Sequence, residues 1–98
     1  MRKVIVSTLV QSKICELNLF LTREFMLSWT AAEARVKRME NFIASLRYEA
    51  DYPLCRFKQW RALSYRCVVF EQSWVFVYEI VQEGVVIRDM SHTTVLAE

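Results

Sequence analysis

The sequence predicts an α+β fold in which two N-terminal helices pack on one face of a small, largely antiparallel sheet. Three observations indicate this class. β-Branched and aromatic runs gather in the last third of the chain, two stretches with helical periodicity come before them, and only one glycine and one proline interrupt 98 residues. With 54% hydrophobic residues, a chain of this length is expected to form one domain over residues 1–98 with short connections.

The N-terminal part predicts one strand followed by two helices. Residues 4–10 are apolar and largely β-branched, which is typical of a strand. Helical periodicity begins at Ser12, and this first helix is expected to end near residues 26–28. Its apolar positions are Ile14, Leu17, Leu21 and Met26. Thr30 and Glu33 match a capping box and predict the start of the second helix, which Pro53 separates from the strands. The apolar side of this second helix is formed by Ala32, Val36, Met39, Ile43 and Leu46.

Three strands are predicted after Pro53, over residues 65–70, 74–81 and 85–90. Their connections are short enough for hairpins, and Gly84 lies where the second turn requires positive φ. The expected order is therefore strand, helix, helix, strand, strand, strand. Because the strand over residues 74–81 is apolar on both faces, it requires cover on both. The helices supply one cover. The other is a dimer mate, a binding partner or a folded-over C-terminal segment, unless the valines of that face are simply exposed.

Composition excludes several kinds of site. The three cysteines are odd in number and lack C-x-x-C spacing, which predicts neither a disulfide framework nor zinc and fits a reducing, cytoplasmic compartment. One glycine excludes a glycine-rich phosphate loop, and one histidine excludes a histidine-rich metal site, so no cofactor or metal is expected. No apolar run approaches the roughly 18 residues of a membrane-spanning helix, so no contact with a membrane is expected.

The segment "CRFKQWRALSYRC", residues 55–67, carries the strongest functional signal. It holds four of the 13 basic residues and no acid, so the remainder of the chain has 9 basic against 11 acidic side chains. Its cations and rings suit single-stranded nucleic acid, the same cations suit an acidic protein segment, and a third interpretation has Trp60 and Tyr65 packed inward with the charges in solvent. The candidate binding residues, with one from the last strand, are Arg56, Lys58, Trp60, Arg61, Tyr65, Arg66 and Arg88.

His92 follows the last predicted strand. An imidazole there can transfer protons near neutral pH, and the alternative is a partly exposed histidine with no chemical role.

Residues 65–94, "YRCVVFEQSWVFVYEIVQEGVVIRDMSHTT", resemble the RelE/ParE superfamily of toxins from bacterial toxin–antitoxin systems, and the element order extends the resemblance over most of the chain. The resemblance implies that the first strand lies beside the last and that the sheet face opposite the helices meets RNA. It also implies that the partner is a cognate antitoxin, which often has an acidic tail that folds on binding. The expected assembly is a homodimer or a heteromer with the antitoxin.

Two activities divide that superfamily. RelE-like members cut messenger RNA on the ribosome with basic side chains, and ParE-like members poison DNA gyrase without them. Arg66 matches the first basic position of the nuclease, whereas the next three fall at Val68, near Val75 and near Thr93. The resemblance therefore favours a ParE-like or divergent toxin. The alternatives are a metal-independent, ribosome-dependent messenger RNA endonuclease and a non-toxic relic that only binds its partner. The catalytic set of the nuclease alternative would be Arg66 and His92 with Arg61 and Lys58.

Overall fold

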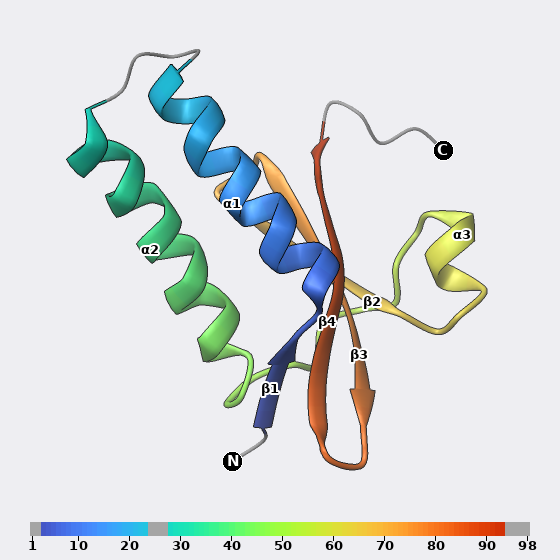
Figure 1. Ribbon diagram of the computed structural model, residues 1–98. Coiled ribbons are helices and arrows are strands. Elements are labelled where there is room, and N and C mark those ends of the chain that lie inside the picture. Colours follow the sequence, from blue (N-terminus) through green and yellow to red (C-terminus); the bar gives the residue numbers. More distant parts are fainter. Residues whose placement is uncertain (1–2, 24–27, 94–98) are drawn as a thin grey trace.

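The computed structural model describes residues 3–23 and 28–93 (Figure 1). In these ranges the chain forms an α+β fold with three helices and one four-stranded mixed sheet, which confirms the predicted class. The elements are β1 (Lys3–Val6), α1 (Thr8–Arg23), α2 (Trp29–Ser45), α3 (Lys58–Arg61), β2 (Arg66–Phe70), β3 (Trp74–Val81) and β4 (Gly84–His92). The short helix α3 was not predicted, and it lies within the basic segment.

The sheet has the strand order β1-β4-β3-β2. The three C-terminal strands form an antiparallel meander, while β1 joins the other side of β4 in parallel, from Lys3 opposite Gly84 to Val6 opposite Ile87. Helices α1 and α2 lie side by side on one face, and α3 lies beyond the opposite face (Figure 1). We call these the helix face and the far face.

The predicted strand over residues 4–10 is too long, because β1 ends at Val6 and α1 begins at Thr8. Ser7 separates the two elements, and its hydroxyl accepts a hydrogen bond from the amide of Val10 at 3.3 Å, as a helix cap does. In the helix Val10 becomes fully buried, so packing outweighs the β preference of its side chain. The predicted helix position Met26 lies outside the described residues.

The predicted capping box at Thr30 and Glu33 is also wrong. Helix α2 begins at Trp29, and the hydroxyl of Ser28 accepts from the amide of Ala31 at 3.1 Å. A serine at this position satisfies one of the amides that the first turn leaves without a partner.

Both hairpin turns use left-handed backbone. Glu71 and Gln72, between β2 and β3, have φ of 50° and 63°. Gly84 has φ of 153°, as predicted for the second turn, and a Cβ placed there would lie 2.0 Å from the carbonyl oxygen of Lys3. Glycine is required at this position because β1 pairs so closely against it.

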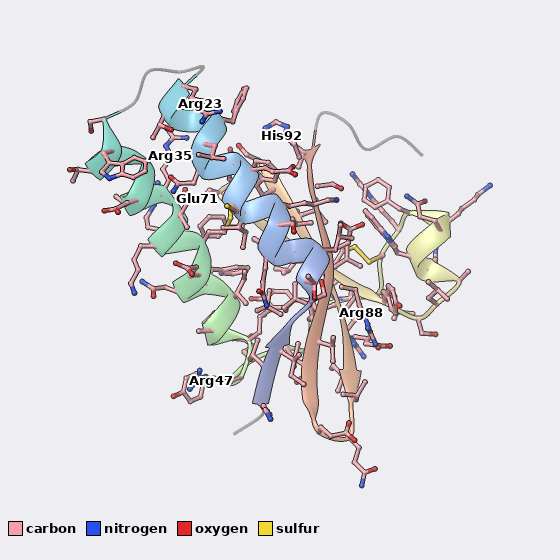
Figure 2. All side chains as sticks on the ribbon, in the orientation of Figure 1. Arg23, Arg35, Arg47, Glu71, Arg88 and His92 are labelled. Carbon is pink, nitrogen blue, oxygen red and sulfur yellow. A yellow bond between two sulfur atoms is a disulfide. The ribbon has the colours of Figure 1, made fainter. Side chains whose placement is uncertain are left out.

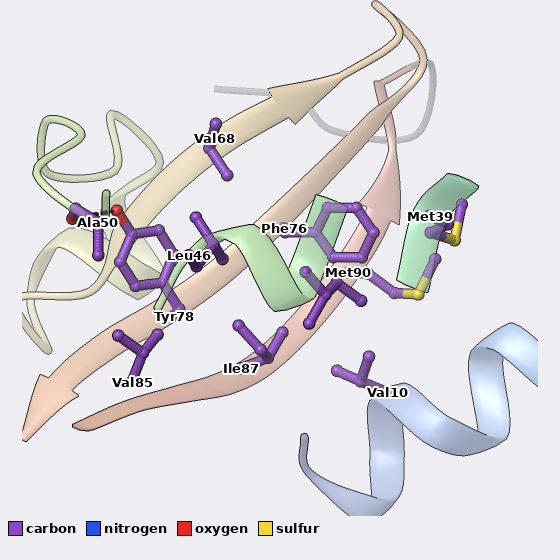
Figure 3. Packing of buried hydrophobic residues seen from close by; sticks show 11 residues of the cluster. Val10, Met39, Leu46, Ala50, Val68, Phe76, Tyr78, Val85, Ile87 and Met90 are labelled. Carbon is purple, nitrogen blue, oxygen red and sulfur yellow. Dashed lines mark hydrogen bonds between the residues drawn. The ribbon is translucent and has the colours of Figure 1, made fainter. Parts of the chain in front are cut away.

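The main core fills the space between the sheet and helices α1 and α2 (Figure 3). Tyr78 of β3 is fully buried there, and its hydroxyl donates to the carbonyl of Ala50 and accepts from the amide of Tyr52. The loop that follows α2 is thereby fixed to the sheet. The buried members are Val10, Met39, Ile43, Leu46, Ala50, Val68, Phe76, Tyr78, Val85, Ile87 and Met90.

A second, smaller core lies on the far face. It contains Cys55, Val75 and Val77, with Trp60 and Tyr65 packed against it. The second cover of β3 is therefore the protein's own segment between α2 and β2. This agrees with the interpretation that Trp60 and Tyr65 pack inward, which was not connected with the cover of β3.

Candidate functional site

The basic segment is a covalently closed loop. Cys55 and Cys67 form a disulfide with a Cα–Cα distance of 4.8 Å, which contradicts the prediction that no disulfide would form. The odd cysteine is Cys15, which is free and exposed on α1. The two partners are only 12 residues apart, and the extended backbone on each side of the loop brings them together. We call residues 55–67 the basic loop.

Backbone hydrogen bonds close the base of the basic loop. The amide of Cys55 donates to the carbonyl of Tyr65 at 2.9 Å, and that of Cys67 donates to the carbonyl of Pro53 at 3.4 Å. An isolated bridge between Leu54 and Arg66 lies between them. The segment before the loop therefore runs antiparallel to the start of β2 and covers part of that open strand edge.

Within the basic loop the rings face inward and the charges outward. Phe57 is buried and meets Trp60 edge to face, with ring centroids 5.7 Å apart. Trp60 and Tyr65 are half-buried against the far-face core. Arg56, Lys58 and Arg61 are exposed, and the guanidinium of Arg56 lies 5.4 Å from the ring centroid of Phe57. Inside the described ranges, neither Lys58 nor Arg61 forms an ion pair. The loop thus presents cations over an apolar base, and its half-buried rings are less available for base stacking than the sequence suggests.

Arg66 lies on the opposite side of the sheet from the other cations of the loop. It pairs in register with Tyr78, whose side chain is in the main core, so both belong to the helix face. The guanidinium of Arg66 is half-buried and donates from Nη1 to the carbonyl of Tyr52. This contact gives Arg66 a structural partner in the loop after α2.

His92 lies at the other end of the helix face. It pairs with Trp74, and the two rings meet edge to face with centroids 5.1 Å apart. Trp74 is four residues from Tyr78 on β3, about 13 Å along the strand, and β2 and β4 flank β3 at about 10 Å from each other. Arg66 and His92 are therefore well separated, and neither shares a face with Arg61. The structure does not bring the candidate catalytic set together.

Arg88 lies on the far face at a bulge in β4. Val77 pairs with Asp89 and Tyr78 with Ile87, so Arg88 is the extra residue. Its guanidinium donates twice to Glu79 of β3, once from Nε at 2.8 Å, and this hydrogen-bonded carboxylate raises the pKa of Arg88. Because its charge is compensated, Arg88 adds little to the positive field of the basic loop.

Sequence reasoning missed one cleft on the helix face, which is lined by His92 and by both charged and apolar side chains. Arg35 and Arg38 of α2 line it, and Arg38 donates to Glu71 at 3.1 Å. Arg35, Glu71 and His92 lie toward the same end of the molecule (Figure 2). The spacing of three between the arginines is the signal that places both on one side of a helix. Other lining residues are Leu17, Phe20, Met39, Phe70, Ser73 and Trp74.

Comparison with models of known protein families gave no match. A search of curated proteins gave none either. Among the described helices, none has both the length and the hydropathy needed to cross a bilayer. Over the same residues, His, Cys, Asp and Glu side chains do not gather in any group of three that could hold a metal ion.

Proposed function

We propose that this chain is a RelE/ParE-like toxin that a cognate antitoxin neutralises, and that its activity is ParE-like or divergent rather than that of a RelE-like nuclease. The observation that carries the proposal is the basic loop, a disulfide-closed surface with exposed cations on the face opposite α1 and α2. An acidic, partly disordered protein segment has the complementary chemistry.

The chain topology supports the proposed fold. The resemblance implies a helical pair on one face and a first strand beside the last, and β1 lies parallel to β4 with α1 and α2 packed together. Helix α3 departs from the expected order, because it inserts one helical turn before β2. This turn presents Lys58 and Arg61, so the departure itself builds the proposed binding surface.

The positions of the cations argue against the nuclease alternative. Stabilising a phosphoryl transition state requires several cations around one phosphate. Arg66 donates to a backbone carbonyl on the helix face, whereas Arg61 belongs to the far face. Val68 and Val75, which stand where the nuclease has cations, are both buried.

Expression of the chain alone in bacteria tests the toxin proposal. We expect growth arrest with altered DNA supercoiling or DNA breaks and intact messenger RNA. If a short acidic protein is encoded beside this one, its co-expression should relieve the arrest. Ribosome-dependent cleavage of messenger RNA would instead favour the nuclease. Normal growth with intact DNA and RNA would overturn both toxin functions and leave a partner-binding relic.

A pair of charge-reversal variants tests the binding surface. The double variant Lys58→Glu with Arg61→Glu should weaken binding of the acidic partner by about 10- to 100-fold, because close charge pairs across an interface couple strongly. The matched control is Arg35→Glu with Lys37→Glu, which changes the net charge equally at exposed positions of α2, outside the basic loop. Titration calorimetry at two salt concentrations measures the affinity of each double variant for the acidic partner. Equal weakening by the two variants would contradict a specific role for the basic loop.

A further inference from the structure

The two cysteines of the basic loop differ in their access to solvent. Cys55 is 1% exposed within the far-face core, whereas Cys67 is half-buried and lines an open groove of about 520 Å³ beside β2. Arg56, Leu54 and Val69 line the same groove. We propose that Cys55–Cys67 is a reversible modification site, opened by a small thiol of the glutathione class that attacks Cys67, and that its opening releases the basic loop from the sheet.

The groove suits an anionic thiol. The attacking species in disulfide exchange is a thiolate, and a guanidinium beside its path stabilises the negative charge on sulfur. Arg56 supplies that cation at the wall of the groove, whereas the surroundings of Cys55 are apolar and closed. Both access and charge therefore direct attack to the sulfur of Cys67.

The exchange takes two steps and two thiols. A thiolate forms a bond to Cys67 Sγ while the Cys55–Cys67 bond breaks, and the Cys55 sulfur leaves as a thiolate that takes up a proton. A second thiolate then attacks the sulfur of the bound small thiol, which releases a small-molecule disulfide and leaves Cys67 as a thiolate that also takes up a proton. The protein disulfide is reduced by two electrons, and the two small thiols are oxidised to one disulfide.

After reduction only non-covalent contacts hold the basic loop on the far face. They are two backbone hydrogen bonds at its base and the packing of Trp60 and Tyr65 against Val75 and Val77. Closing a loop of this length by a cross-link favours the closed state by a factor on the order of 100 in the chain-entropy description. The reduced loop should therefore open far more often, while the main core beneath α1 and α2 stays folded, because neither cysteine belongs to it in the described part of the chain.

A disulfide that opens in this way is of the transient, redox-sensing kind that occurs in reducing compartments. The groove and the disulfide are present whether or not the chain is a toxin.

Trypsin provides a direct measurement, because Lys58 and Arg61 lie on exposed α3 within the loop. The experiment uses the full chain carrying Cys15→Ser, which removes the free thiol, equilibrated in glutathione buffers from oxidised to fully reduced. We expect cleavage after Lys58 and Arg61 to become about 100-fold faster in the reduced protein. Cleavage after Lys37, in the middle of α2, reports global unfolding and should change far less.

Mass spectrometry of the protein trapped part-way through reduction identifies the attacked sulfur. We expect the glutathione adduct on Cys67, and we expect Arg56→Gln to slow adduct formation several-fold while Arg61→Gln leaves it unchanged. An adduct on Cys55 would overturn the proposed point of attack. Equal loop cleavage in both redox states, equal acceleration after Lys37, or reduction only in denaturant would overturn the local opening. If Cys15→Ser does not fold, the wild-type chain alkylated at Cys15 serves instead.

Discussion

Replacing Arg66 by alanine tests whether this residue acts as a structural brace. The substitution removes the hydrogen bond from the guanidinium to the carbonyl of Tyr52 and leaves that carbonyl without this donor. Hydrogen bonds from charged groups contribute about 1.5–3 kcal/mol, and because Arg66 is only half-buried we expect a loss near the lower end, about 1.5–2 kcal/mol. With a urea m-value of about 1 kcal/mol/M, the midpoint of unfolding should fall by about 1.5–2 M.

Urea unfolding followed by tryptophan fluorescence measures this loss. Arg61→Ala is the matched control, because it removes the same type of side chain from an exposed position on α3 and should change stability by less than about 0.5 kcal/mol. If Arg66→Ala and Arg61→Ala unfolded at the same urea concentration, the stabilising role of Arg66 would be refuted. The result also affects assays of toxicity, since a loss of activity in Arg66→Ala must be compared at equal folded fraction before a catalytic role is inferred.

Three further substitutions test the fold. Burial raises the pKa of the Tyr78 phenol, so above pH about 10 the unfolded chain loses this proton while the folded chain keeps it, and stability should fall as pH rises. Tyr78→Phe should be about 1–3 kcal/mol less stable at neutral pH, because it loses both hydrogen bonds of the hydroxyl. Its free energy of unfolding should also fall less steeply above pH about 10 than that of the wild type. Urea unfolding at a series of pH values measures both, and an equally steep fall in the two proteins would contradict the prediction. Gly84→Ala should lower the free energy of unfolding, measured by calorimetry, by about 2–4 kcal/mol, because the new Cβ meets the backbone of β1. Glu83→Ala should leave this free energy nearly unchanged. Ser28→Ala should lower the melting temperature in line with a loss of about 1 kcal/mol, and a larger loss in Thr30→Ala would restore the predicted capping box.

Periodicity predicted the larger elements of the fold but misplaced the ends of most of them. The strand over residues 74–81 was predicted with its observed bounds, because alternating large apolar side chains over eight residues leave few alternatives. The first strand was extended too far because Val10 favours a strand locally, while its burial in the main core as a residue of α1 decides its conformation. Helix α3 has four residues, which is too short for periodicity to reveal.

The surface chemistry of the basic loop was predicted better than its construction. The exposed cations were identified from the sequence, but the disulfide was missed because an odd cysteine count hides which pair meets in space. The face occupied by Arg66 was also beyond sequence reasoning. Its orientation depends on where β2 begins to pair with β3, and a shift of one residue would exchange the faces of Arg66 and Cys67.

The parallel pairing of β1 with β4 has a consequence for how the chain folds. Ser7 and Arg88, which touch at the end of that pairing, are 81 residues apart in sequence, while the hairpins of the meander are local. During synthesis α1, α2 and the β2–β3 hairpin can form early, but β1 has no strand to join until β4 has been made. An apolar N-terminal strand must therefore wait unpaired, and it is the part of the nascent protein most exposed to aggregation or to capture by a chaperone.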